Sequence, residues 1–196
     1  MKKITLLVPF AFMVIVIVSC RKEDTTNQLG LPEKTQTGNQ TLGFLSNESI
    51  WTNSGQYCDQ SSGACRQNIH AYYYPGNTIV LICADKNTTT KSNERKIEAF
   101  TLVVDVTQKG TLTFQNGNLQ DANMFIVEGK DKYAYYPSLI EPDFRATVSK
   151  FDTLNKIISG EFSGKLYKQN VSGTAGISAP DSLIIKEGRF DIKIIK

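Results

Sequence analysis

Hydrophobic and polar residues alternate with a period of two over long stretches of the chain. Because successive side chains of a β-strand point to opposite faces, such alternation predicts strands with one face in a core. The clearest runs lie at residues 100–106, 111–114, 158–166 and 189–194. Residues 79–84 (Ile-Val-Leu-Ile-Cys-Ala) are apolar at every position, which predicts a strand in the middle of a sheet.

Short segments rich in Gly, Asn, Pro and charged residues separate these runs and predict tight turns. They lie at residues 47–48, 75–77, 109–110, 116–118, 128–131 and 186–188. Many short strands joined by such turns are typical of antiparallel all-β folds. We therefore predict an all-β domain over residues 41–196, folded as an antiparallel β-sandwich, with Trp51 in its core beside the first hairpin. A closed or partly open β-barrel would produce the same pattern.

Residues 1–19 have the pattern of an export signal. Lys2 and Lys3 precede an apolar run over residues 4–18. As a helix this run would be about 22 Å long, which is shorter than the roughly 30 Å of a bilayer's hydrocarbon core. It therefore fits a cleaved signal peptide better than a membrane-spanning anchor. Residues 17–20 (Ile-Val-Ser-Cys) resemble a lipobox, which predicts cleavage before Cys20 and acylation of its thiol.

Residues 20–40 have no apolar period and are rich in Thr, Asn, Gln and Gly. They are predicted to form the lipidated cysteine and a flexible tether with a reach of roughly 25 Å. Residues 21–24 (Arg-Lys-Glu-Asp) are similar to the signal that sends lipoproteins of Bacteroidota to the outer face of the outer membrane. The expected location is therefore the outer membrane, at the cell surface or otherwise at the periplasmic face. Residues 24–26 (Asp-Thr-Thr) resemble a Bacteroidota O-glycosylation acceptor, which predicts modification of Thr25.

The net charge excludes one class of partner. The formal charge falls from +3 to +1 when removal of the signal peptide takes away Lys2 and Lys3. So small a charge provides no general attraction to nucleic acid, and the lipid on Cys20 makes the membrane the expected partner instead.

Three cysteines remain when Cys20 is lipidated. Cys58 and Cys65 flank a short polar segment and are predicted to form a disulfide bond, as suits an oxidising compartment. Cys83 lies in the apolar run and is expected to be a buried free thiol. Pairing of Cys83 with either of the other two is the alternative, because spacing does not fix connectivity. Their spacing does not match a zinc site, so no metal site is predicted.

Two motifs at the ends of the domain carry a family resemblance. Residues 31–38 (Leu-Pro-Glu-Lys-Thr-Gln-Thr-Gly), followed by residues 43–45 and by Ile50 and Trp51, resemble the opening of a family of small lipoproteins from Bacteroidota. Residues 156–162 and 187–192 are similar to the end of that family. This chain has Asn47-Glu48 where the family usually has Asn-Gly in the first hairpin turn. The resemblance implies an all-β domain in the cell envelope, and it supplies no catalytic residues.

Enzyme motifs are absent from the sequence. His70 is the only histidine, and no nucleophile elbow, zinc-protease motif or phosphate-binding glycine loop occurs. We therefore predict no catalytic residue and no cofactor. Two tyrosine clusters, at residues 72–74 and 133–136, stand out instead. Because tyrosine combines a flat apolar ring with a polar tip, we hypothesise that Tyr72, Tyr74 and Tyr135 contact a ligand. Packing between neighbouring strands is the alternative.

These features favour a membrane-anchored, surface-exposed lipoprotein that acts as a non-catalytic binding module for a glycan or a protein. One alternative is a glycan hydrolase that uses two carboxylates brought together by the fold. Another is a structural envelope protein without a small ligand.

Overall fold

The computed structural model describes residues 30–53, 56–58, 65–76, 78–89, 95–106, 110–113, 122–128, 131–138, 143–169 and 180–195. Every regular element within these residues is a β-strand, which confirms the predicted all-β class. Residues 1–29, with Cys20 and Thr25, lie outside the described residues, so lipidation and glycosylation stay predictions.

The strands range from three to fourteen residues in length. Their bounds are β1 (Thr41–Ser46), β2 (Ser49–Thr52), β3 (Gln56–Cys58), β4 (Cys65–Gln67), β5 (Ile69–Tyr74), β6 (Ile79–Thr89), β7 (Arg95–Asp105), β8 (Gly110–Thr113), β9 (Ala122–Glu128), β10 (Asp131–Pro137), β11 (Arg145–Asp152), β12 (Ile157–Gln169) and β13 (Ser182–Ile195).

Eleven strands are hydrogen-bonded in the order β2-β1-β13-β5-β6-β7-β9-β10-β12-β11-β8, and β3 and β4 form a separate hairpin. All pairings between these strands are antiparallel except one. The C-terminal end of β13 runs parallel to β5, with Ile194 opposite Ala71 and Ile195 opposite Tyr72. This pairing is the single departure from the predicted antiparallel arrangement among the described strands.

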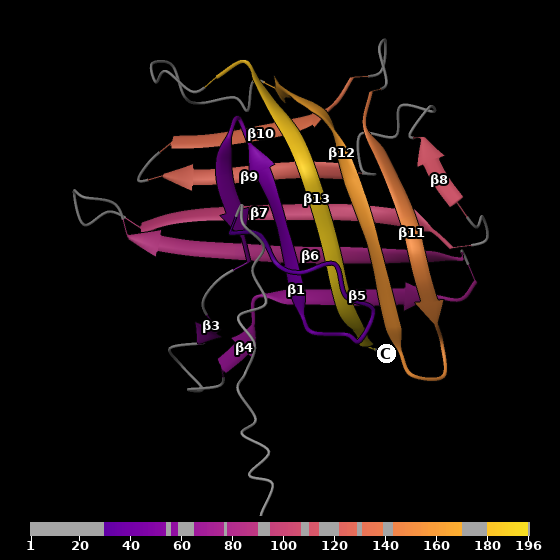
Figure 1. Ribbon diagram of the computed structural model, residues 1–196. Coiled ribbons are helices and arrows are strands. Elements are labelled where there is room, and N and C mark those ends of the chain that lie inside the picture. The colour runs from indigo at the N-terminus through magenta and orange to yellow at the C-terminus, as the bar shows by residue number, and fades with distance from the viewer. Residues whose placement is uncertain are drawn as a thin grey trace, which may run out of the picture.

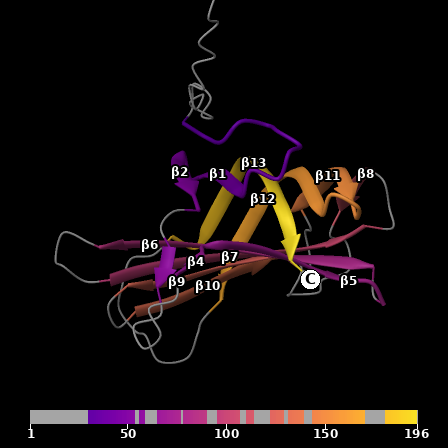
Figure 2. The ribbon, with the colours of Figure 1, turned by 90° about the horizontal axis from the view of Figure 1, so that it is seen from below.

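The strands form two layers that cross each other (Figures 1 and 2). β5, β6, β7, β9 and β10 make one layer, and β1, β2, β13, β12, β11 and β8 lie across it. The layers join where β13 meets β5 and where β12 meets β10, and the pairing of β12 with β13 closes a ring of seven strands. Crossed layers joined at their corners are typical of orthogonal β packing. Both the predicted sandwich and the alternative barrel therefore fit this architecture.

An aromatic cluster fills the space between the two layers. Phe44 stacks on Trp51 with ring centroids 4.7 Å apart, and Phe100 lies 5.0 Å from both Phe44 and Phe162. Trp51 is only 3% exposed, which confirms its predicted place in the core beside the first hairpin. Stacked and tilted ring pairs of this kind add to the hydrophobic stabilisation of burial.

Two glycine–phenylalanine pairs lie opposite each other on the neighbouring strands β12 and β13. Gly160 lies opposite Phe190, and Phe162 lies opposite Gly188. A Cβ atom on Gly160 would lie 2.5 Å from Cζ of Phe190, and one on Gly188 would lie 2.6 Å from the ring of Phe162. Each ring therefore covers the backbone of the glycine on the neighbouring strand, and these positions exclude a side chain.

Residues 31–39 lie against the outer face of β12 and β13. Leu31 is fully buried, and the guanidinium of Arg189 donates a 3.2 Å hydrogen bond to the carbonyl oxygen of Pro32. The prediction of a flexible tether therefore does not hold for this segment. The folded domain begins no later than Gly30, not at residue 41.

The carboxylate of Asp191 holds this segment in place. It is 1% exposed. Its Oδ1 accepts hydrogen bonds from the backbone N–H of Gly38 (2.8 Å) and the hydroxyl of Ser159 (2.7 Å). Its Oδ2 accepts from the Thr35 hydroxyl (2.5 Å) and the backbone N–H of Thr37 (3.0 Å). Burial by itself raises the pKa of Asp191, but these hydrogen bonds outweigh it and lower the pKa below its ordinary value of 3.8.

Candidate ligand-binding cavity

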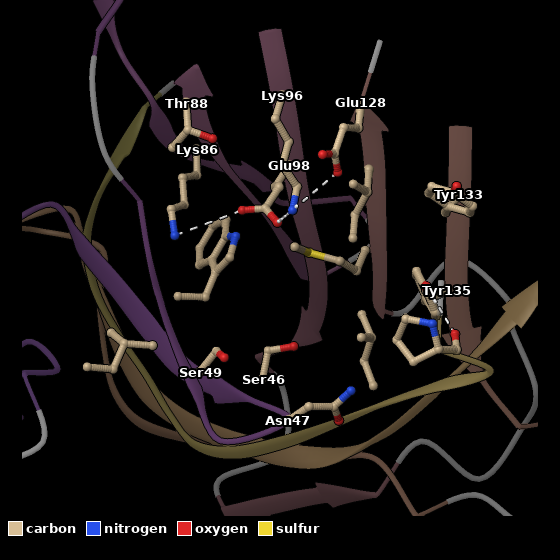
Figure 3. Close-up of a pocket in the computed structure, with 16 residues that line it drawn as sticks. Ser46, Asn47, Ser49, Lys86, Thr88, Lys96, Glu98, Glu128, Tyr133 and Tyr135 are labelled. Atoms are coloured by element: carbon tan, nitrogen blue, oxygen red, sulfur yellow. Dashed lines mark hydrogen bonds and ion pairs between the residues drawn. The ribbon is translucent and has the colours of Figure 1, made fainter. Parts of the chain in front are cut away.

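A cavity of about 490 Å³ opens between the two layers beside the aromatic core. The inner faces of β6, β7, β9 and β10 form one wall, and the β1–β2 hairpin with Pro180 and Leu183 forms the other (Figure 3). A volume of this size is within the range that small-ligand sites usually have. The cavity is therefore the first place to look for a binding function.

At the cavity, the inner face of β6, β7, β9 and β10 changes from apolar to polar along the strands. Successive rows of side chains lie across β6, β7, β9 and β10, and the pairing register defines each row. The first row belongs to the core, the second is mixed and the third is polar. They consist of Ala84, Phe100, Met124 and Tyr135; of Lys86, Glu98, Ile126 and Tyr133; and of Thr88, Lys96, Glu128 and Asp131.

Glu98 is the buried charge of the cavity. Only 9% of this residue is exposed. Its Oε1 lies 3.1 Å from the Lys96 ammonium, and its Oε2 lies 3.9 Å from the Lys86 ammonium. Lys96 also lies 3.7 Å from Glu128. Figure 3 shows Glu98 between the two lysines. Paired in this way, the buried carboxylate avoids the large cost of an isolated charge, and the four groups sum to zero charge.

The β1–β2 hairpin brings Trp51 to the opposite wall. Asn47 and Glu48 both have positive φ, +46° and +66°, as the central residues of a type I′ turn do. The side chain of Asn47 ties the turn to β13, because its Oδ1 accepts from the backbone N–H of Ile184 at 2.8 Å. Lys186 contacts Glu48 at 2.6 Å. The turn therefore has the type I′ form that Asn-Gly often adopts, although Glu48 stands at its second central position.

The indole N–H of Trp51 is buried and has no hydrogen-bond partner among the described residues. Buried donors in native structures are nearly always satisfied, and leaving one unsatisfied costs about 1–3 kcal/mol. The nitrogen is not exposed to the cavity that other atoms of Trp51 line, so an acceptor atom of a bound ligand would reach this donor only after a shift of the ring.

Two tyrosines of the second cluster also line the cavity. Tyr135 is buried, and its hydroxyl donates to the Pro180 carbonyl at 3.1 Å. Burial raises the pKa of Tyr135, and nearby Tyr133 and Asp181 raise it further. The ammonium of Lys168 lies 5.0 Å from the centre of the Tyr133 ring. Both phenols are therefore held in place as a wall rather than as a mobile surface.

The structure does not bring the three predicted contact tyrosines to one surface. Tyr72 and Tyr74 lie on the outer face of β5, where Tyr72 is half-buried and Tyr74 is 46% exposed. Tyr135 faces the interior from β10, and β6, β7 and β9 separate the two strands in the sheet. Tyr72 and Tyr74 therefore lie apart from the cavity that Tyr135 lines.

The remaining cysteines lie away from the cavity. The backbone of β3 and β4 places Cys58 opposite Cys65, and their side chains lie outside the described residues, so the disulfide bond stays a prediction. Cys83 is free, as predicted, but half-buried rather than buried. Burial raises the pKa of its thiol, while a hydrogen bond with Thr101 acts in the opposite direction. It lies opposite His70 on the outer face of β6.

Among the described residues, no His, Cys, Asp or Glu group of three or more is arranged to hold a metal ion. The same residues contain no helix of the length and apolarity that crossing a membrane requires. Comparison with protein-family models, with curated proteins and with solved structures finds no match to this chain.

Proposed function

We propose that this protein is a lipid-anchored envelope protein whose β domain binds a glycan, without catalysis, in the cavity between its two layers. The observation that carries the proposal is the cavity of about 490 Å³, whose lining combines Trp51 and other apolar side chains with the paired Glu98 and Lys86. The signal sequence and the lipobox ending at Cys20 support the anchored location.

A glycan suits both walls of the cavity. A sugar ring has faces of C–H groups that pack on aromatic and aliphatic side chains, and the lining supplies Trp51, Met124 and Ile126 for them. The ring edge carries hydroxyl groups that both donate and accept hydrogen bonds. The charged rows offer acceptors at Glu98 and donors at Lys86 for them. A purely apolar ligand would place no hydrogen-bonding group opposite Glu98 and Lys86.

Binding fits the cavity better than hydrolysis does. A two-carboxylate hydrolase needs one acid that keeps its proton at working pH. Glu98 and Glu128 both line the cavity, but Lys96 lies within 4 Å of each. Both carboxylates are therefore engaged in ion pairs with the same ammonium, and neither is left free for proton transfer to a substrate.

The test uses the mature chain with Cys20→Ala on a glycan array, followed by calorimetry of the best ligand. We expect Trp51→Phe, which keeps an aromatic ring beside Phe44 and removes the five-membered ring with its N–H, to weaken binding by about tenfold, the equivalent of about 1.4 kcal/mol. Tyr74→Phe on the outer face is the matched control and should bind as wild type does. Equal affinity of Trp51→Phe and wild type would contradict the proposed site. Release of new reducing ends from a bound glycan, lost in Glu98→Gln, would establish hydrolysis instead.

The anchor is tested separately by mass spectrometry in a bacterial host that acylates lipoproteins. We expect Cys20 to be the acylated N-terminal residue, and Cys20→Ala to leave the membrane fraction. A protein that retains Met1, or a Cys20→Ala variant that stays with membranes, would contradict this part of the proposal.

A further inference from the structure

One ion pair of the cavity is too long to be a direct hydrogen bond. Lys96 contacts Glu98 at 3.1 Å, whereas the Lys86 ammonium lies 3.9 Å from Oε2 of Glu98. That separation exceeds the usual N–H···O hydrogen-bond range of about 2.7–3.2 Å. Lys86 has three N–H donors and a carboxylate oxygen has two acceptor positions. An acceptor and a donor on a ligand can therefore bind side by side at this ion pair.

Adjacent hydroxyl groups on a sugar ring match such a pair. One hydroxyl donates to Oε2 of Glu98, and its neighbour accepts from the ammonium of Lys86. The C–H face then lies toward the apolar lining, which includes Trp51. Two described groups thus supply one donor and one acceptor for one small ring.

The charge balance of the cavity distinguishes between classes of sugar. Lys86, Lys96, Glu98 and Glu128 sum to zero, and each already has an opposite charge within 4.0 Å. An acidic sugar would bring a third carboxylate near Glu98 and Glu128, and an amino sugar would bring a third ammonium near the lysines. Either would break an existing pair and leave one partly buried charge without its partner, which is costly. A neutral sugar forms its hydrogen bonds without disturbing the pairs.

We propose that the cavity selects a neutral sugar through two adjacent hydroxyl groups held between Glu98 and Lys86, an inference that rests on the glycan binding proposed above. The probes are the methyl glycosides of glucose, galactose and mannose, each compared with its 6-carboxylate and its 2-amino analogue. Trp51, the only tryptophan of the chain, reports binding by its fluorescence in the mature chain with Cys20→Ala.

At least one neutral glycoside should give a saturable fluorescence change, with an affinity that differs less than about twofold between low and high salt. Its charged analogues should bind at least about tenfold more weakly. Glu98→Gln and Lys86→Met should each weaken binding about tenfold, whereas Lys34→Met, which removes an exposed ion pair elsewhere, should have no effect.

A change on the ligand keeps the test independent of protein folding. The deoxy analogue that lacks one of the two hydroxyl groups should bind wild type about tenfold more weakly than the parent glycoside does. With Glu98→Gln the two glycosides should bind equally well, because the coupled pair is already broken. Tighter, salt-sensitive binding of an acidic or amino sugar would overturn the inference and leave the proposed glycan binding intact. Failure of all three neutral glycosides would overturn it as well, and an array without any glycan ligand would remove the proposed function too.

Discussion

The Oδ1 atom of Asp191 accepts a 2.8 Å hydrogen bond from the backbone N–H of Gly38, which precedes it by 153 residues. Gly38 has a φ of +76°, and a Cβ there would lie 2.8 Å from the Lys193 side chain. Only glycine adopts this conformation without strain and fits this space. The Thr-Gln-Thr-Gly segment therefore binds a buried carboxylate, and its sequence follows from that contact rather than from a spacer role.

Asp191→Asn should destabilise the domain by about 2–4 kcal/mol. In either orientation the new amide N–H₂ faces a backbone N–H donor, Gly38 at one oxygen position or Thr37 at the other. Urea unfolding followed by circular dichroism measures the loss. Glu161→Gln, which removes the exposed pair with Lys34, is the control and should change stability by less than about 0.5 kcal/mol. Equal stability of the two variants would contradict the role of Asp191.

Asp191 should contribute to the free energy of unfolding only above the pH range in which its carboxyl group titrates. Because the folded-state pKa lies below the ordinary value of 3.8, the ionised form is favoured by folding. Its contribution is fully present above about pH 5 and is lost as the pH falls through the folded pKa. The difference in unfolding free energy between wild type and Asp191→Asn should therefore shrink below about pH 4. Asp152, whose pKa is also lowered, chiefly by hydrogen bonds from Asn155, titrates in both proteins and does not affect this difference. A difference that grows in acid would contradict the prediction.

Strands such as β7 were predictable from the sequence because their hydrophobic residues are buried and alternate with more exposed polar ones. Phe100 and Leu102 are fully buried with Thr101 half-buried between them, as a period of two requires. Residues 31–39 were not predictable as part of the domain, since they have no apolar period. Leu31 gives no periodic signal by itself, and Asp191 looks like an ordinary solvent-facing residue of an alternating strand. Long-range hydrogen bonding, rather than local pattern, places this segment.

Gly160→Ala should destabilise the domain by about 3 kcal/mol. The added Cβ would lie 2.2 Å from the carbonyl oxygen of Thr147 and 2.5 Å from the Phe190 ring, so strands β11, β12 and β13 would have to shift. Thermal unfolding of the variant measures the effect. Gly76→Ala is the matched control, since nothing lies within 4 Å of its Cβ position, and it should unfold as wild type does. Unchanged stability of Gly160→Ala would show that the sheet relaxes around the methyl group.

The candidate cavity was only partly visible in the sequence. Tyr135 was selected for ligand contact and does line the cavity, but Trp51, Lys86 and Glu98 were not selected. One signal was present: Glu98 shares the face of Phe100, so a polar residue continues a core face along the same strand. What sequence could not supply is the register that sets Glu98 opposite Lys86, because pairing between strands is a property of the whole sheet.

Cys58 and Cys65 should form the disulfide bond of the exported protein. Directly opposed residues of a hairpin are close enough for such a bond, and closing this short loop contributes about 2.5 kcal/mol in the chain-entropy model. Alkylation before and after denaturation, followed by peptide mapping without reduction, should recover these two residues linked and Cys83 alkylated. A linked Cys83 peptide would contradict the assignment.

The last strand of the chain is also the partner of its first described residues. β1 and the segment around Gly38 bind β13, which also pairs with β12 and β5. β1 can pair with β2 early, but its pairing with β13 needs residues 185–191, which lie more than 135 residues further along the chain. Contacts so distant in sequence slow folding. Removal of the residues from Arg189 onward would thus take away the partners of Gly38 and of residues 41–43 together.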